Sequence, residues 1–149
     1  MYKHILVPTD GSTLSLKAAK SASKLAKTLG AKITALYVIE PYAPPMGGDG
    51  MIFYAGGFSP EDYEKAAEKT ARKALDKVKA IADADGVKCA TAAVTEAQPW
   101  EAIVKAARSK KCDLIVMASH GRKGLTGLLL GSETTKVLTH TRTPVLVCR

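Results

Sequence analysis

The sequence predicts an α/β protein built on a single doubly wound, five-stranded parallel sheet with helices on both faces. From end to end, the chain alternates short apolar runs with longer segments of helical periodicity. The apolar runs are nearly continuous, as expected of strands that are covered on both faces. The connections between them are mostly short, and right-handed crossovers then place all the strands parallel in one sheet.

The predicted elements follow a regular order. The five strands are expected at residues 4–8, 32–39, 87–95, 113–118 and 144–148. The four helices between them are expected at about residues 12–29, 60–85, 98–107 and 132–141. Gly30 stands just past the first helix, where a left-handed residue commonly ends a helix. Ser59 followed by Pro60 is a typical helix start, with a hydroxyl N-cap and a proline at the first helical position.

Two loops follow predicted strands and are expected at the carboxyl edge of the sheet, where open parallel sheets bind ligands. They are residues 8–12 and 117–132, and the second holds four glycines and the adjacent cations Arg122 and Lys123. This glycine-rich loop enters a helix at Gly131, and a helix N-terminus offers unpaired N–H groups with partial positive charge. The pattern predicts a site for the phosphates of a nucleotide. The alternative is a flexible glycine hairpin without a ligand.

Two common nucleotide motifs are absent from the sequence. There is no GxxxxGK[ST], so the lysine and the magnesium-binding hydroxyl of a P-loop are missing. There is also no GxGxxG, so a standard dinucleotide fold is unsupported.

Length and composition describe an ordinary globular chain. The 149 residues favour one domain over 1–149, and no apolar run approaches the roughly 20 residues of a membrane span. The first residues contain one cation and then a strand, without a signal-peptide core, so we expect a cytoplasmic protein. Cys89, Cys112 and Cys148 lack metal-ligand spacing and are expected to be small buried hydrophobic residues in a reducing compartment.

The net charge of +8 invites a nucleic-acid interpretation. However, the cations of the long central helix alternate with acids, which is typical of a solvated face that pairs with itself. The aromatic residues (two Phe, one Trp and five Tyr) form no stacking platform interleaved with the cations. We therefore expect no nucleic-acid partner, and we expect the positive charge to favour smaller anions such as phosphates.

Four segments resemble the universal stress protein family, in its small single-domain form, and the resemblance covers essentially the whole chain. They are Ile5-Leu6-Val7-Pro8-Thr9-Asp10-Gly11-Ser12, Met117-Ala118-Ser119-His120-Gly121-Arg122, Leu130-Gly131-Ser132 and Thr143-Pro144-Val145-Leu146-Val147. ATP-binding members of the family carry Gly, two residues, Gly, nine residues, Gly, and then Ser or Thr. Gly121, Gly131 and Ser132 match the last three of these positions, with nine residues between the glycines. The resemblance implies a Rossmann-like fold of the adenine nucleotide alpha hydrolase-like type.

Ala118 stands where the family pattern has its first glycine. A methyl group costs little at a residue with negative φ and causes strain at positive φ. Because the change adds one carbon, we expect nucleotide binding to tolerate it.

The resemblance implies that Asp10 meets the nucleoside, where its carboxylate can accept a hydrogen bond from a ribose hydroxyl or the adenine amine. On local grounds Asp10 is equally well the N-cap of the helix that starts near Ser12. Val38, which ends the second strand, is implied to pack on the base and to offer it backbone groups. Alternatively, Val38 is an ordinary residue of the hydrophobic core.

The resemblance also implies that the phosphates lie on main-chain N–H groups of the glycine-rich loop and the helix after it. The residues concerned are Gly121, Arg122, Lys123, Gly131, Ser132, Glu133 and Thr134. The side chains of Arg122 and Lys123 either close over the phosphates or face water. Glu133 would repel a phosphate, so only its N–H group is expected to face the ligand. The remaining implied binding residues are Pro8, Thr9, Met117, Ala118 and Ser119.

Two further features have alternative interpretations. His120 lacks a neighbouring carboxylate to orient it and lacks metal-ligand spacing to His4 or His140, so it is interpreted as a hydrogen-bonding loop residue. The glycine-rich segment 43–57 suits either a mobile lid or a disordered loop.

The last predicted strand, residues 144–148, is an apolar run at the edge of the sheet. Exposed edges of this kind invite pairing with another chain, and a twofold dimer is the commonest outcome. We expect a homodimer through this strand, and the resemblance implies the same surface.

Together these observations predict an ATP-binding regulatory protein of the stress response, with Mg²⁺ on the phosphates and no catalytic residues. ATP would order the glycine-rich loop and so shift the conformational populations of a surface that an unidentified protein partner recognises. One alternative is a slow ATPase or phosphotransferase, for which Asp10 and Glu133 are poor candidates. The other is a dimerisation or interaction module that binds no nucleotide.

Overall fold

The structure is a computed structural model of the chain, and it describes residues 1–44, 59–121 and 130–149. Strands and helices alternate as expected, with boundaries close to the predicted ones. In chain order they are β1 (His4–Pro8), α1 (Thr13–Leu29), β2 (Lys32–Ile39), α2 (Pro60–Ala84), β3 (Cys89–Thr95), α3 (Pro99–Ser109), β4 (Leu114–Ala118), α4 (Ser132–His140) and β5 (Val145–Cys148). In the part of the chain that the structure describes, no helix has the length and apolar character needed to cross a membrane.

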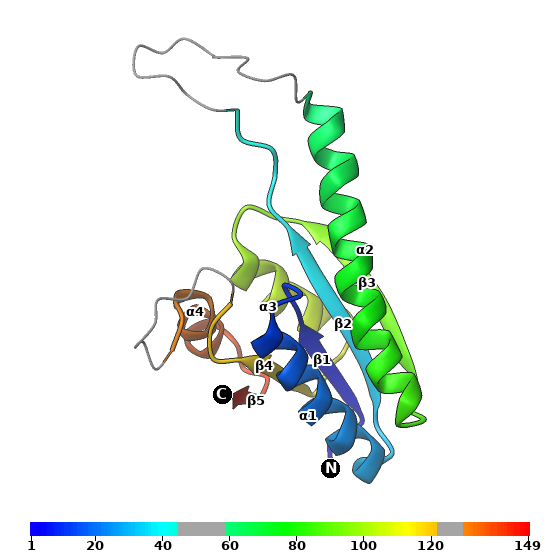
Figure 1. Ribbon diagram of the computed structural model, residues 1–149. Helices are drawn as coiled ribbons and strands as arrows, with labels where there is room; N and C mark the ends of the chain where they lie inside the picture. Colours follow the sequence, from blue (N-terminus) through cyan, green and yellow to red (C-terminus); the bar gives the residue numbers. More distant parts are fainter. Residues whose placement is uncertain (45–58, 122–129) are drawn as a thin grey trace.

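The five strands form one parallel sheet in the order β3-β2-β1-β4-β5, which confirms the predicted fold class. The chain builds the sheet outward from β1 to β3, and then returns through α3 to place β4 on the other side of β1 (Figure 1). The switch of direction therefore lies between β1 and β4. In an open parallel sheet this is the place where the loops leave a crevice for a ligand.

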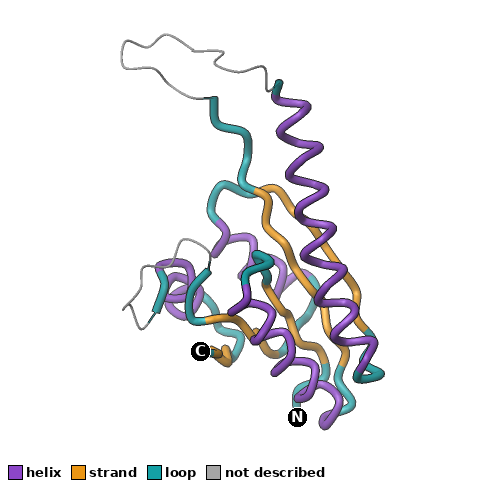
Figure 2. Tube along the Cα trace, in the orientation of Figure 1, coloured by secondary structure: helices purple, strands orange, loops and turns teal. Residues whose placement is uncertain are grey.

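Helices cover both faces of the sheet because successive residues of the inner strands point in opposite directions (Figure 2). Ile5 and Val7 of β1 belong to a core cluster with residues of α1 and α2. Leu6, between them, belongs to a second cluster with residues of α3 and α4. On α1 the core residues are mostly alanines, among them Ala22 and Ala26, whose short side chains let the helix lie close to the sheet.

Ser23 is a fully buried hydroxyl on α1 that ties this helix to the end of α2. Its Oγ donates a hydrogen bond of 2.6 Å to Asp85 Oδ2, just past the last residue of α2. We expect Ser23→Ala to lower the free energy of unfolding by about 1–2 kcal/mol, because a hydrogen bond to a charged group is lost. Urea denaturation measures this change. Thr28→Ala is the control, because the exposed Thr28 hydroxyl donates only to Lys24 O of its own helix.

At the amino edge of the sheet, the Asp113 carboxylate caps the start of β1. Its oxygens accept the N–H groups of Lys3 at 2.9 Å and His4 at 3.0 Å. Burial acts to raise the pKa of Asp113, but these hydrogen bonds outweigh it and hold the pKa below its usual value. The His4 ring forms a 2.8 Å hydrogen bond with Thr34 Oγ1, and burial, with the charge of Lys32, lowers the pKa of His4.

The lowered pKa of His4 makes the stability of the fold depend on pH. As the pH falls through about 6.5, the unfolded chain takes up a proton on His4 more readily than the folded chain does, because the pKa of His4 is lowered in the fold. Stability that is present at neutral pH is therefore lost on acidification. We expect His4→Gln, which keeps a hydrogen-bonding group near Thr34, to lose less stability than the parent between about pH 7.5 and about pH 5.5. Urea denaturation at the two pH values measures the difference, and equal losses would contradict the assignment.

The first half of α2 projects beyond the sheet (Figure 1) and contains no buried residue from Pro60 to Thr70. Ser59 and Asp62 form a capping box at its start. Tyr63 donates its hydroxyl to Glu40 O at 2.8 Å. Within α2, which is described throughout, the single ion pair is Lys79–Asp83 at 3.2 Å. The alternating charges of this helix are therefore mostly solvated, and the expectation that they pair with one another was wrong.

Candidate functional site

The loop after β1 is a tight turn held by side-chain oxygens. Thr9 is buried; its N–H donates to Leu36 O at 2.9 Å and its Oγ1 accepts the N–H of Gly11 at 3.1 Å. Gly11 has a φ of +78°, which a residue with a side chain rarely adopts. Asp10 Oδ1 accepts the N–H of Ser12 at 2.9 Å.

Ser12, and not Asp10, is the N-cap of α1. The Ser12 side chain accepts the N–H of Ser15, and the helix begins at Thr13. The interpretation of Asp10 as the N-cap was therefore wrong, because the turn at Gly11 places Asp10 two residues before the cap. Asp10 is half-buried and Pro8, which ends β1, is also half-buried, so both remain at the carboxyl edge.

The end of β4 is buried and is hydrogen-bonded, through the residue that follows it, to β5 and to the start of α4. Met117 and Ala118 are the last two residues of the strand and are nearly inaccessible. Ser119 donates its N–H to Cys148 O at 2.7 Å, and its carbonyl accepts the N–H of Gly131 at 2.7 Å. The Ser119 hydroxyl lies 3.1 Å from Nδ1 of His120. The strand end thus fixes where α4 begins.

The start of α4 presents backbone donors to this edge. Gly131 is its N-cap and, having no side chain, provides no side-chain cap. The first intrahelical bond runs from Thr135 N to Gly131 O, which leaves the N–H groups of Ser132, Glu133 and Thr134 without an acceptor inside the helix. The buried Thr134 hydroxyl donates to Ala118 O at 3.0 Å and anchors this first turn to β4.

The two loops meet at the switch point between β1 and β4. Gly121, on the loop after β4, lies so close to the loop after β1 that a methyl group on it would stand 2.6 Å from Asp10 Oδ2. The structure therefore brings the Asp10 carboxylate next to the glycine-rich loop, although Asp10 and Gly121 are 111 positions apart in the sequence.

Other predicted site residues occupy different positions. Val38 is half-buried beyond Leu36 on β2, pairs with Val94 of β3 and packs against the core of the α3 face. Ser132 is exposed on the first turn of α4. Arg122 and Lys123 lie outside the described residues, as does most of the segment 43–57.

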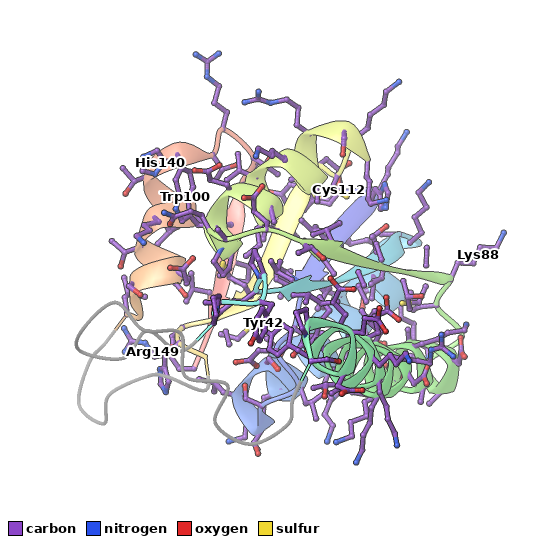
Figure 3. All side chains as sticks on the ribbon, turned by 90° about the horizontal axis from the view of Figure 1, so that it is seen from above. Tyr42, Lys88, Trp100, Cys112, His140 and Arg149 are labelled. Carbon is purple, nitrogen blue, oxygen red and sulfur yellow. The ribbon has the colours of Figure 1, made fainter. Side chains whose placement is uncertain are left out.

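The carboxylate of Glu133 contacts α3. Its Oε2 accepts the N–H of Trp100 at 2.9 Å, and its Oε1 accepts the ammonium of Lys136 at 3.3 Å. Figure 3 shows Trp100 beside His140, and their rings are 4.4 Å apart between centroids. No pattern in the sequence points to this contact, because Glu133 and Trp100 are 33 positions apart and belong to different helices.

The described residues contain no group of three or more His, Cys, Asp and Glu side chains that could hold a metal. Near the paired loops, the half-buried Asp10 carboxylate lies beside Gly121. Mg²⁺ usually keeps several waters and is bound through one or two carboxylates plus substrate phosphates. A carboxylate such as that of Asp10 is a donor that such a metal could use.

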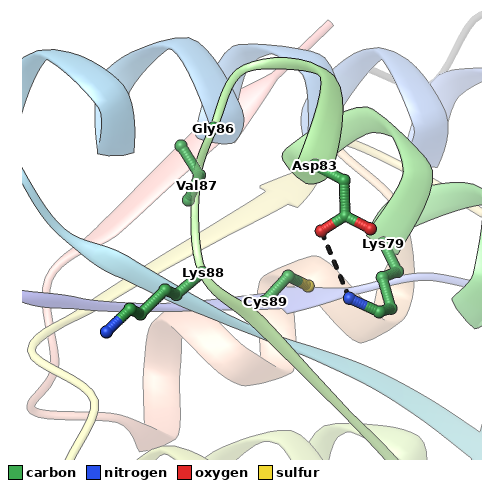
Figure 4. Close-up of a pocket in the computed structure, with 6 residues that line it drawn as sticks. All are labelled: Lys79, Asp83, Gly86, Val87, Lys88 and Cys89. Carbon is green, nitrogen blue, oxygen red and sulfur yellow. Dashed lines mark hydrogen bonds and ion pairs between the residues drawn. The ribbon is translucent and has the colours of Figure 1, made fainter.

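A separate pocket of about 410 Å³ lies at the opposite edge of the sheet, between the end of α2 and the start of β3 (Figure 4). It is lined by Lys79, Asp83, Gly86, Val87, Lys88 and Cys89. None of the predicted site residues lies there. Two of its charges, Lys79 and Asp83, pair with each other.

The fold and the paired loops define a class of α/β protein in which a helix N-terminus faces the switch point of a parallel sheet. A sequence model of the universal stress protein family matches residues 1–149, and the chain belongs to this family.

Relatives and solved structures support the assignment along the full length of the chain. Universal stress protein MJ0531 of Methanocaldococcus jannaschii is 40% identical over 149 residues, which are 100% of this chain and 83% of the relative. The structure of MJ0577 superposes with a TM-score of 0.82 at 28% identity, covering 99% of this chain and 96% of that one. A universal stress protein in complex with cAMP superposes with a TM-score of 0.71 at 27% identity, covering 99% of this chain and 97% of that one. The resemblance found in the sequence is thereby confirmed.

Proposed function

We propose that the chain binds an adenine nucleotide, ATP with Mg²⁺, at the carboxyl edge between β1 and β4. The observation that carries this proposal is the start of α4, where three N–H groups have no acceptor inside the helix. A helix N-terminus of this kind favours phosphate oxygens through both its donors and its dipole. The solved relative in complex with cAMP supports the choice of an adenine nucleotide.

We assign the binding of the nucleoside part of the ligand to Asp10 and Val38. Asp10 is half-buried beside Gly121, and a carboxylate there can accept from ribose hydroxyls or from the adenine amine. Val38 offers a half-buried apolar side chain at the end of the neighbouring strand. Pro8, Thr9, Met117, Ala118, Ser119, Gly121, Arg122, Lys123, Gly131, Ser132, Glu133 and Thr134 complete the proposed site.

We propose a regulatory role and no catalysis. Phosphoryl transfer needs a group that positions the nucleophile and a group that holds the metal near the γ-phosphate. The Glu133 carboxylate is occupied by Trp100 N–H and Lys136, so it is poorly placed for either task. In the proposed role, the nucleotide changes the conformation of the loop after β4, and a protein partner recognises the changed conformation.

We further propose a cytoplasmic homodimer that pairs through β5. This strand bonds to β4 alone in the sheet, and Leu146 on it is 43% exposed. The cytoplasmic location is supported by the three cysteines, which are all free thiols. Burial raises the pKa of Cys112 to about 11, with the charge of Asp113 adding to the effect, so this thiol is protonated and unreactive.

Isothermal titration calorimetry with ATP, AMP and cAMP, each with and without Mg²⁺, tests the proposed function. We expect one nucleotide per chain, and ATP to bind more tightly when Mg²⁺ is present. A protein that binds none of the three would be a nucleotide-free interaction module. If ATP binds but is converted to ADP by the purified protein, and Asp10→Ala stops that conversion, the regulatory assignment gives way to the ATPase alternative.

A further inference from the structure

Glu133 caps a helix to which it does not belong. The N-cap residue of α3, Gln98, makes no side-chain cap hydrogen bond. The N–H of Trp100, in the first turn of α3, instead donates to Glu133 Oε2 at 2.9 Å. We call this contact the Glu133 bridge. It joins the first turns of α3 and α4, and it satisfies a donor that the start of α3 would otherwise leave to water.

The Glu133 bridge holds the turn of α4 whose N–H groups face the proposed phosphate site. Glu133 is the second residue of α4, between Ser132 and Thr134. On the other side, the Thr134 hydroxyl is bonded to Ala118 O. The first turn of α4 is therefore fixed to α3 by one residue and to β4 by the next, so its backbone donors have a set direction.

We propose that Glu133 is a positioning residue for an anionic ligand, acting through Trp100 N–H and not through contact with the ligand. This inference rests on the proposed function. Charge alone would predict that Glu133 weakens binding, because a carboxylate in the first turn of a phosphate-binding helix repels the ligand. The cost of that repulsion is offset when the carboxylate aligns the N–H groups that bind the phosphates.

The two effects of Glu133 have opposite signs, and three variants separate them. Glu133→Ala removes both the charge and the bridge, Glu133→Gln removes the charge but keeps an acceptor for Trp100 N–H, and Glu133→Asp keeps the charge on a side chain one methylene shorter. We expect Glu133→Ala and Glu133→Asp to bind ATP about tenfold more weakly, the equivalent of one lost hydrogen bond. We expect Glu133→Gln to bind at least as tightly as the parent.

Glu101→Ala is the matched control. Glu101 is an acid of the same α3 turn, and its carboxylate pairs with Lys105 at 3.3 Å within that helix. Its removal deletes a charge of the same sign in the first turn of α3 without touching the bridge, and we expect an unchanged affinity for ATP.

Calorimetric titration of each variant with Mg²⁺-ATP gives the outcome, and the melting temperature of each shows that it is folded. If Glu133→Ala binds ATP as well as the parent or better, Glu133 acts by charge alone and the inference is overturned. The same holds if Glu133→Asp matches the parent. A parent protein that binds no nucleotide would contradict the proposed function instead, so the two failures are distinguishable.

Tryptophan fluorescence supplies a second readout of the bridge. Trp100 is the only tryptophan in the sequence, and its backbone is one partner of the Glu133 bridge. We expect nucleotide-free Glu133→Ala to emit at longer wavelength than the parent, and Glu133→Gln to emit as the parent does. An unchanged spectrum in Glu133→Ala would mean that the bridge does not hold Trp100 and would also overturn the inference.

Discussion

Gly131→Val is expected to lose ATP affinity by a factor of about 100 or more, because it displaces the helix start on which the proposed phosphate site is built. A Cβ atom at Gly131 would lie 3.0 Å from Cβ and 3.1 Å from Cα of His120, and 3.3 Å from Ser119 O. These contacts are a few tenths of an ångström too short, so His120 or the start of α4 must shift. Such a shift strains the hydrogen bond from Gly131 N–H to Ser119 O, and we expect a loss of about 1–3 kcal/mol in the free energy of unfolding as well.

Gly131→Ala identifies the cause of the loss. The crowding comes from the Cβ atom itself, so alanine should lose most of the affinity that valine loses. A branched side chain that merely filled the phosphate site would affect valine far more than alanine, and that result would contradict our explanation. Thr139→Val is the control, because it alters an exposed side chain of α4 whose hydroxyl donates to Thr135 O of the same helix and does not contact Gly131. Calorimetry with Mg²⁺-ATP and urea denaturation measure the two effects.

Gly121→Ala is expected to weaken ATP binding about tenfold with little change in stability. The added methyl group would stand 2.6 Å from Asp10 Oδ2, so the carboxylate must turn away from the position we assign to the nucleoside. Gly121 is itself exposed, so the fold has little to lose.

A double-mutant cycle with Asp10→Ala isolates the coupling between the two loops. In the Asp10→Ala background the methyl group at Gly121 meets no carboxylate, and we expect the second substitution to cost little more. Fully additive losses in ATP affinity would show that Gly121→Ala acts in some way other than through Asp10.

Features set by neighbours in the sequence could be predicted, and features set by distant neighbours could not. Gly30 was expected at the end of α1 and has a φ of +65° there, because only local geometry decides that position. Ser59 was expected at the start of α2 and caps it for the same reason. The five strands followed from apolar runs, although buried residues occur only in β1, β2 and β4.

The positions of individual side chains in the candidate site depend on the tertiary fold. The local pattern allowed Asp10 as the cap of α1, whereas in the structure Ser12 caps the helix after the turn at Gly11. The direction of a Cβ atom at residue 131, which points at His120, likewise depends on how the loop after β4 packs. The partner of Glu133 on α3 has no sequence signature, because it depends on how two helices pack over the same face of the sheet.

The two edge strands of the sheet, β3 and β5, differ in how well they suit packing against another chain. Strand β3 ends one margin with exposed Ala90, Thr91, Ala93 and Thr95, which are small or carry a hydroxyl group. Strand β5 ends the other, and among the described residues Leu146 is the only large, exposed apolar side chain on an edge strand. In the proposed homodimer, the exposed Leu146 side chain of each chain would be covered, and only the β3 edges would remain exposed. We therefore expect growth through the sheet to stop at a closed pair and not to continue into a fibre.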